Sequence, residues 1–336
     1  MKTIYYAGEP GAGYGWGVCN TELSKRLAKR CELAYVRAGV HPGTVFMPCI
    51  DADLNPANSA TGDKMLGYTF NEFPLGSKAK ENARRYDTLF CGSTWCQERL
   101  AERDILNTEV LVQGVDHTIF HPGAPRAPDG MLRIFSGGKF EFRKGQDIVL
   151  AAFKQLSKDV RCHLFASWWN FWPHTMASMT ASRVAKFRGL TGQDWPRDYY
   201  ETVNRFFSDN DVDPATVTVL PPLFQRTLAE VMRGTDIGLF PNRCEGGTNL
   251  VLMEYMACGR LTVATEGTGH LDVIGGVSVG LDGATDKLGW VEATPERLAE
   301  AAQYVHEHAD TSCPLAAKCM QQWTWDRMAD QVYARA

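Results

Sequence analysis

The stretch PNRCEGGTNLVLMEYMACG at residues 241–259 is the most informative part of the chain. A short apolar run leads into it, and the apolar residues after its glycine pair predict a helix over 249–257. Gly246 and Gly247 allow a ligand to approach the backbone closely, and Thr248 or Asn249 can cap the helix. The first free N–H groups of a helix, together with its dipole, attract phosphate. The sequence therefore predicts a phosphate-binding turn between a strand and a helix.

Two glutamates accompany this turn. Glu245 stands just before the predicted helix, and Glu254 lies well inside it. This placement suits one carboxylate that contacts a sugar and one that accepts hydrogen bonds from ribose hydroxyls. The alternative is a tight turn followed by a solvated helical glutamate. The glycines alone would favour that alternative, whereas the whole string favours a ligand site.

Strand and helix patterns alternate along the rest of the chain. Short apolar runs predict strands, and apolar residues with a period near 3.6 predict helices between them. The strands are expected at 3–6, 33–37, 66–70, 88–91, 110–112, 132–136, 162–166, 217–220, 237–241 and 261–264. The helices are expected at about 21–30, 94–103, 146–156, 227–233, 249–257, 295–305 and 323–336. Such alternation is typical of parallel sheets covered by helices.

A segment rich in proline and glycine, FHPGAPRAPDGM at 120–131, separates two series of strands and helices. We expect an α/β fold with two Rossmann-like domains, residues 1–125 and 126–320, whose parallel sheets face each other across a cleft. Ligands of such sheets bind at the carboxyl ends of the strands, so the cleft is the expected site. Residues 321–336 are expected to form a C-terminal helix that packs back on the first domain.

The composition is that of an ordinary globular protein. The chain has 336 residues, 44% of them apolar and 22% charged, and its length suits two domains rather than one core. A net charge of −4 gives no general reason to expect a nucleic-acid partner. The sequence has no apolar run of the roughly 20 residues that span a bilayer.

The ten cysteines lack the CxxC spacing of zinc sites, and the first residues do not resemble a signal peptide. Free thiols in a reducing cytoplasm are favoured over a disulfide framework. We therefore expect a cytoplasmic protein, and a peripheral association with a membrane is left open.

The 241–259 string resembles the E-x7-E region of family 4 of the retaining glycosyltransferases with the GT-B fold. In that family the first glutamate and nearby amides hold the donor sugar and diphosphate, and the second glutamate holds the ribose. Here eight residues rather than seven separate Glu245 from Glu254, so that the family's first glutamate falls on Gly246 when Glu254 is aligned. The resemblance implies that Glu245 takes the catalytic role from a slightly altered turn. It assigns donor binding to Gly246, Gly247, Thr248, Asn249, Leu250 and Glu254.

GGKFEFRKGQD at 137–147 fits the family's Gly-Arg/Lys…Lys-Gly segment. Lys139 and Lys144 take the places of its two cations, and Gly138 and Arg143 join the implied donor site. Basic side chains can stabilise the charge that develops on a leaving diphosphate, so neither a metal nor another cofactor is expected. The alternative for this segment alone is a basic surface loop.

Three further segments match the family more loosely. The glycine-rich loop at 11–17 implies that Gly15 and Gly17 lie over the donor, with a flexible turn as the alternative. VLPPLFQ at 219–225 lies where the family binds the nucleobase, so Pro222 and Leu223 are expected to contact the base. GYTFNEFPL at 67–75 resembles the end of a strand that carries Glu72 toward the acceptor, with a surface or capping role equally open. QGVDHTIFHPG at 113–123 fits the family's hinge and places the domain border near residue 125.

Two other patterns have ordinary structural explanations. The aromatic residues of ASWWNFWPHTMASM at 166–179 could stack on sugars, but packing is favoured. Asp51-Ala52-Asp53 has the form of a metal-binding DxD, yet Asn55 and Pro56 follow it and predict a loop. No metal site is therefore expected.

The resemblance implies a metal-independent, hexosyltransferase-like enzyme that moves a sugar from a nucleoside-diphosphate sugar to an acceptor hydroxyl with retention. The acceptor, whether glycan, lipid-linked or small molecule, and the oligomeric state are left open. The alternatives are a non-catalytic nucleotide-sugar binding protein and another GT-B chemistry, such as a nucleobase-modifying transferase. The first domain is short for the family.

Overall fold

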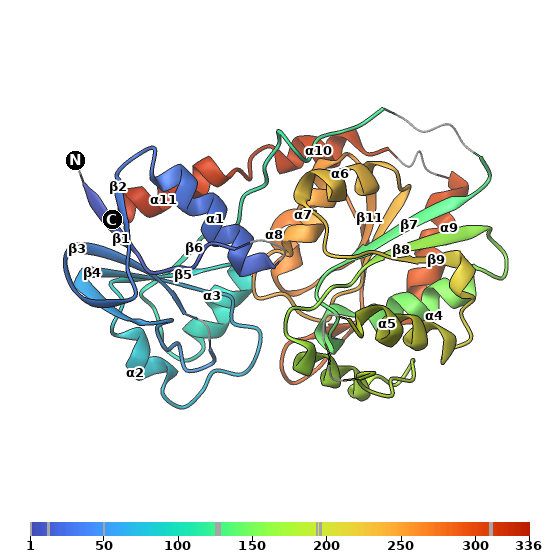
Figure 1. Ribbon diagram of the computed structural model, residues 1–336, viewed down its shortest axis with the longest axis horizontal. Helices are drawn as coiled ribbons and strands as arrows, with labels where there is room; N and C mark the ends of the chain where they lie inside the picture. The colour runs from blue at the N-terminus through green and yellow to red at the C-terminus, as the bar shows by residue number, and fades with distance from the viewer. Residues whose placement is uncertain are drawn as a thin grey trace.

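The computed structural model describes residues 2–11, 14–49, 51–124, 129–192, 194, 197–308 and 312–336, apart from the side chain of Cys49. Its described residues form two six-stranded sheets that lie side by side along the long axis of the molecule (Figure 1). Among the described residues, neighbouring strands within each of these two sheets are parallel. The predicted α/β class with two parallel sheets is therefore confirmed.

The first sheet has the strand order β2-β1-β3-β4-β5-β6. Its strands are β1 (Thr3–Tyr6), β2 (Glu32–Tyr35), β3 (Ala38–Cys49), β4 (Ser59–Thr69), β5 (Thr88–Cys91) and β6 (Thr108–Val110). Its helices are α1 (Gly15–Leu27), α2 (Ala79–Ala83) and α3 (Thr94–Ala101). Helix α1 begins six residues earlier than position 21, so that Gly15 and Gly17 belong to its first turn rather than to the loop that we expected.

Strand β3 is an element that the sequence did not predict. It contains Pro42 and Gly43, which usually interrupt strands. The structure accommodates both residues through a shift in the β3–β4 register between His41 and Thr44, and Gly43 has a φ of +109°. Val45 and the buried residues near it pack in a core to which β1, β3 and β4 all contribute.

The second sheet has the order β12-β11-β10-β7-β8-β9. Its strands are β7 (Leu132–Gly137), β8 (Cys162–Ser167), β9 (Val217–Val219), β10 (Ile237–Phe240), β11 (Leu261–Thr265) and β12 (Val279–Leu281). Strand β12 was not predicted. A separate antiparallel pair consists of β13 (Ala284–Thr285) and β14 (Val291–Glu292). Every residue of β10 is buried, as expected for a central parallel strand covered on both faces.

Helices cover this second sheet on both faces (Figure 1). They are α4 (Gln146–Leu156), α5 (Tyr199–Ser208), α6 (Gln225–Arg233), α7 (Leu250–Ala257), α8 (Leu271–Ile274), α9 (Pro295–His308) and α10 (Pro314–Met320). Short 3-10 turns occur at η1 (Phe142–Lys144), η2 (Pro173–Ala181), η3 (Pro214–Thr216) and η4 (Thr268–His270). The expected apolar face of α4 is buried and packs in a core with α5, α9 and the sheet.

The last helix, α11 (Trp325–Arg335), returns to the first sheet (Figure 1). Its buried residues Trp325, Met328 and Val332 share a core with β1 and α1. Arg30, three residues after the end of α1, contacts Asp330 of α11 at 2.6 Å. The expected border at residue 125 falls outside the described residues. The chain thus crosses between the halves twice, and the second crossing ties its end to its beginning.

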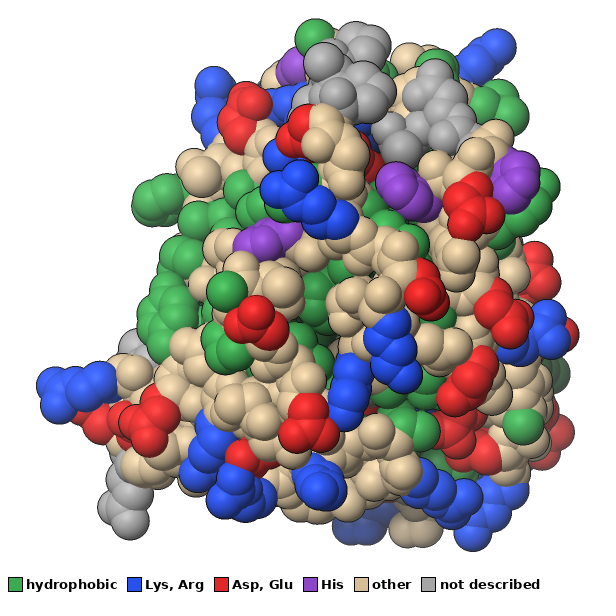
Figure 2. Space-filling model, turned by 90° about the vertical axis from the view of Figure 1, so that its right-hand side faces the viewer, with side chains coloured by type: hydrophobic (Ala, Val, Ile, Leu, Met, Phe, Trp, Pro, Cys, Tyr) green, Lys and Arg blue, Asp and Glu red, His purple; other side chains and the backbone are tan. Residues whose placement is uncertain are grey.

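In the described segments, no helix combines the length and apolar character that a membrane crossing requires. The nine cysteines whose side chains are described are not joined to one another by disulfides. Acidic and basic side chains are interspersed over the outer face of the second half (Figure 2).

The return of α11 can be tested at Gly114. A Cβ at this position would lie 2.1 Å from the backbone nitrogen of Trp325, so Gly114→Ala requires the helix start to move. We expect this change to lower the free energy of unfolding by about 1–3 kcal/mol, as overpacking does, and denaturant titration measures it. Gly234→Ala is the control, because its methyl group would meet ordinary contacts at 3.4 Å. Equal stability of the two variants would contradict the close packing of α11.

Candidate active site

A cavity of about 910 Å³ lies between the two sheets. The loops that follow the carboxyl ends of several strands line it, as expected for parallel sheets with helical crossovers. The structure brings most of the predicted residues to its wall: Gly15, Glu72, Gly138, Lys139, Arg143, Lys144, Pro222, Leu223, Glu245, Gly247, Asn249, Leu250 and Glu254. These residues come from both halves of the chain.

Gly17, Gly246 and Thr248 lie behind this wall. A Cβ on Gly17 would lie 2.6 Å from the ring of Tyr14, and one on Gly246 would lie 2.7 Å from the carbonyl carbon of Phe70. The Thr248 hydroxyl donates to the sulfur of Met253 at 3.0 Å. These three residues therefore allow close packing around the cavity, which the sequence pattern did not indicate.

The start of α7 faces the cavity without a side-chain cap. Asn249 occupies the N-cap position with φ 61° and ψ 87°, but its side chain makes no capping hydrogen bond. Instead its Nδ2 lies 3.2 Å from Nε2 of His270, and Thr248 is engaged with Met253. Asn249 thus takes the expected N-cap position, but its side chain does not make the expected capping hydrogen bond. Uncapped N–H groups at a helix start are free to bind an anion.

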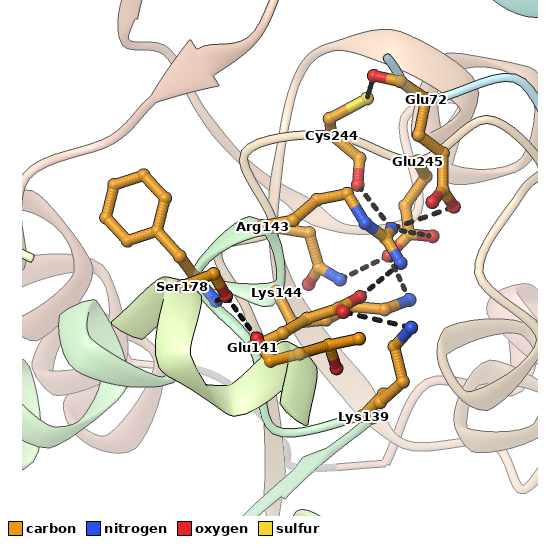
Figure 3. A network of polar contacts seen from close by, with 12 residues as sticks. Glu72, Lys139, Glu141, Arg143, Lys144, Ser178, Cys244 and Glu245 are labelled. Atoms are coloured by element: carbon orange, nitrogen blue, oxygen red, sulfur yellow. Dashed lines mark hydrogen bonds and ion pairs between the residues drawn. The ribbon is translucent and has the colours of Figure 1, made fainter. Parts of the chain in front are cut away.

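A cluster of ion pairs forms one wall of the cavity (Figure 3). Lys144 Nζ lies 2.6 Å from Glu245 Oε1. Arg143 Nη1 lies 3.0 Å from Glu72 Oε1 and 3.2 Å from Glu245 Oε2. Asn242 donates a further short hydrogen bond to Glu245. The cluster joins Glu72 of the first half to cations of the second half.

Glu141 completes this cluster and was missed by the sequence analysis. Its two carboxylate oxygens contact Lys139 at 2.9 Å and Arg143 at 2.6 Å. The alternation of acidic and basic residues around a buried Phe140 was the available signal. Three acids therefore face three cations beside the cavity.

A single 3-10 turn directs Arg143 and Lys144 into the cluster. The turn η1 ends at Gly145, whose φ is +73° and whose Cβ would lie 2.3 Å from the carbonyl oxygen of Pro241. Only glycine fits such a position without strain. Arg243 packs against the turn, with its guanidinium 3.7 Å from the ring centre of Phe142.

The carboxyl groups of the site differ in the direction in which their pKa values are shifted. Burial disfavours the charge of Glu245, but Lys144 and Arg143 outweigh it and lower its pKa to about 2. Burial raises the pKa of Glu72, and Arg143 offsets this effect only in part. Burial also raises the pKa of Glu254 to about 8, against a weak hydrogen bond from Gln225 at 3.4 Å.

The halves also meet through neutral contacts next to these charges. Ser93 donates to the carbonyl oxygen of Gly246 at 2.8 Å. The indole of Trp290 donates to the carbonyl oxygen of Glu72 at 2.9 Å. These bonds hold the main chain of both site segments while leaving the carboxylate of Glu72 in the cavity wall.

The aromatic stretch 166–179 divides between core and cavity. Trp168 is fully buried and stacks between Phe140 and Phe207, so that packing explains it. Phe171 and Trp172 are 42% and 40% exposed and line the cavity. The ring of Tyr14 meets Trp172 at 5.2 Å and so links the first half of the chain to this rim.

The aspartates of the DxD pattern stabilise a loop, as expected. Asp51 accepts hydrogen bonds from the backbone of Asp53 and Asn55, and Asp53 accepts one from the backbone of Lys78. Within the described ranges, no group of three or more His, Cys, Asp or Glu residues is placed to hold a metal ion.

Residues 189–308 match the family described as glycosyl transferases group 1. A segment of the second half is thus similar to this family. This match confirms the predicted enzyme class, while its finer family remains a prediction. No curated protein matches the chain in sequence.

Solved structures of glycosyltransferases share the fold. Sucrose-phosphate synthase from Thermosynechococcus elongatus superposes with a TM-score of 0.67 at 15% identity, covering 100% of this chain and 99% of that one. HepE from Anabaena, in complex with UDP and glucose, gives 0.65 at 11% identity, with coverage of 100% and 99%. A trehalose-6-phosphate synthase studied for transfer with retention gives 0.58 at 14% identity, with coverage of 88% and 73%. These likenesses confirm the GT-B fold.

The buried carboxyl of Glu254 makes stability depend on pH. In the folded chain it keeps its proton up to about pH 8, whereas an unfolded chain loses it near 4.5. Rising pH therefore destabilises the wild type, by up to about 1.4 kcal/mol per pH unit between these values. We expect Glu254→Gln to be increasingly more stable than wild type from pH 5 to pH 8 in denaturant titrations.

The exposed Glu201 on α5 provides the control, because Glu201→Gln changes the same group in solvent. A Glu254→Gln variant whose stability follows that of wild type at every pH would show that the Glu254 carboxyl is not buried in the ligand-free protein.

Proposed function

We propose that this chain is a retaining glycosyltransferase that moves a sugar from a nucleoside-diphosphate sugar to an acceptor hydroxyl without a divalent metal. One observation carries the proposal. A single cavity is lined by Lys139 and Lys144, by the uncapped start of α7 and by Glu254. A diphosphate needs the first two features, and the ribose beside it needs a hydrogen-bond acceptor such as the carbonyl oxygen of a carboxyl group.

The donor would lie along the second half of the chain. Its diphosphate meets Lys144, Lys139 and the first N–H groups of α7. Glu254 follows Leu250 by four residues, or about 6 Å along the helix, and binds the ribose hydroxyls there. Pro222 and Leu223 line the same side of the cavity and contact the base.

The reaction breaks the bond between the sugar C1 and the phosphate oxygen and forms one from C1 to the acceptor oxygen. The nucleoside diphosphate leaves with the electron pair, and one of its phosphate oxygens takes the acceptor proton. Lys144 stabilises the charge that grows on this leaving group. Retention is proposed from the family resemblance, and one structurally similar enzyme was studied for transfer with retention.

The two halves would divide this work. We propose residues 1–125 as the acceptor domain and 126–320 as the donor domain, with 321–336 fastening them together. Glu72 enters the cavity from the acceptor side. We also propose a cytoplasmic setting, because the family resemblance implies a nucleotide-sugar donor.

A donor panel tests the proposal. Thermal-shift measurements with UDP, GDP and ADP should show stabilisation by one of them, because a ligand that binds only the native state raises the unfolding midpoint. The sugars of that nucleotide are then assayed for hydrolysis and for transfer to glycan, lipid-linked and small acceptors. Binding without any turnover would favour the non-catalytic alternative, and transfer to a nucleobase would favour the nucleobase-modifying one.

Lys144→Ala should lower kcat by about a hundredfold, or roughly 3 kcal/mol, because its charge acts on the leaving group. Glu254→Ala should instead raise KM for the donor, because ribose binding is the same in ground and transition states. Lys154→Ala on the surface of α4, where Lys154 pairs with Asp211, is the control. Steady-state kinetics that leave Lys144→Ala equal to this control would contradict the assigned role of Lys144.

Chelation tests the proposed metal independence. We expect full transfer activity after treatment with EDTA, because three basic side chains supply the positive charge at the diphosphate. Initial rates are compared with and without EDTA, and with added Mg²⁺ or Mn²⁺. Loss of transfer with EDTA and recovery with either metal would contradict this assignment.

A further inference from the structure

The ion pair between Glu72 and Arg143 is where charges of the two halves meet in the cavity wall (Figure 3). The side chain of Glu72 is 21% exposed and that of Arg143 is 6% exposed. Both residues line the cavity, and Glu72 is the more exposed of the two. A phosphate group that approached Arg143 from the cavity would meet Glu72 first.

The charges around this pair balance. Three carboxylates pair with three cations: Glu72, Glu141 and Glu245 with Lys139, Arg143 and Lys144. A diphosphate would add negative charge to a buried site that is already neutral, and unpaired buried charge is costly. Tight binding therefore requires one carboxylate to move away or to become protonated.

Glu72 is the acid that is held least. Glu245 contacts Lys144, Arg143 and the amide of Asn242, and Glu141 contacts both Lys139 and Arg143. The carboxylate of Glu72 contacts Arg143 and is the most exposed of the three.

The main chain at Glu72 would not need to follow its side chain. Its carbonyl oxygen is held by the indole of Trp290 at 2.9 Å. The guanidinium of Arg143 also has an unused donor, because its buried Nε makes no hydrogen bond within the described residues. Nη1 also donates to the carbonyl oxygen of Cys244 and to Glu245. Rotation of the Glu72 side chain therefore leaves these bonds in place and removes one of the carboxylates that balance the charge of Arg143, so that Arg143 can attract a new anionic partner.

We propose that Glu72 is a positioning residue that occupies the place of a donor phosphate on Arg143. The Glu72–Arg143 pair and bound diphosphate then exclude each other, so that donor binding releases Glu72 toward the acceptor. This inference rests on the proposed function for its ligand, a nucleoside diphosphate, and adds a competitor within the protein itself.

Release of Glu72 links diphosphate binding to proton uptake. Once separated from Arg143, the carboxyl group still faces Glu141 and Glu245, with Lys144 as the remaining nearby cation. The neighbouring His270 and Cys244 carry no charge near neutral pH, because burial lowers the pKa of His270 to about 4 and raises that of the Cys244 thiol. Glu72 therefore takes up the proton, and diphosphate binds more tightly as pH falls.

Calorimetry with inorganic diphosphate tests this inference, because that probe has no ribose to contact Glu254. Wild type and Glu72→Gln are compared from pH 6 to pH 9, so that the titration of the probe itself cancels. We expect Glu72→Gln to bind about tenfold more tightly at pH 8, with the ratio shrinking toward pH 6. Titrations in two buffers of different ionisation enthalpy should show proton uptake by wild type that the variant lacks.

Glu230→Gln is the charge-matched control, because Glu230 pairs with Arg233, is 75% exposed and lies outside the cavity wall. It should behave as wild type. Equal or weaker binding by Glu72→Gln at every pH would overturn the inference, provided that its thermal midpoint shows a folded protein. A folded Lys144→Met variant that binds diphosphate as wild type does would overturn it too, because the probe would then bypass this cluster.

Failure of the proposed function gives a different pattern. If no nucleotide sugar is turned over but Glu72→Gln still gains affinity for diphosphate, the competitor role stands and the enzymatic proposal fails. If transfer is observed and Glu72→Gln gains nothing, the enzymatic proposal stands and Glu72 has another role.

Discussion

The site depends on the closeness of one glycine turn to the first half of the chain. A Cβ on Gly246 would lie 2.7 Å from the carbonyl carbon of Phe70, and one on Gly92 would lie 3.0 Å from the Cα of Gly247. Ser93 fastens the same turn by its bond to the carbonyl oxygen of Gly246. The turn is thus both the joint between the halves and the approach to the start of α7. Any movement of the halves must therefore change the end of the cavity at the start of α7.

The buried charges of the cavity wall are better explained by binding than by stability. Removing ions from water costs several kcal/mol for each ion, and apolar residues of similar size often serve a core equally well. Arg143 nevertheless has three carboxylates around it, and Glu245 is held ionised by its two cations. A neutral, tightly bonded cluster keeps cations in place beside a cavity without an exposed excess of charge. Because the cluster is neutral, the entry of another anion would disturb its charge balance.

Local patterns predicted most of this structure, and long-range contacts supplied what they could not. The strands around β10 and the helix α7 follow from apolar runs and periodicity, which are properties of short segments. Strand β3 was not predicted, because Pro42 and Gly43 break the local pattern. Its pairing with β4 accommodates both residues through a register shift. The contact of Glu72 with Arg143 joins residues far apart in the chain, and no spacing rule reaches that far. The role of Glu141 was not predicted, because it depends on the burial of this residue between two cations.

The spacing of Glu245 and Glu254 has a steric explanation in this fold. In the resembled family, the first glutamate would fall on Gly246, but a side chain there would meet the backbone of Phe70 at 2.7 Å. The acid stands one residue earlier instead. The amide of Glu245 donates to the hydroxyl of Thr268 at 3.0 Å, and its carboxylate reaches Lys144 at 2.6 Å. Gly246 is thus the additional residue between the two acids, and it packs closely against the first half of the chain. Both Glu245 and Glu254 still line one cavity. The longer spacing is therefore compatible with the donor site that the resemblance implies.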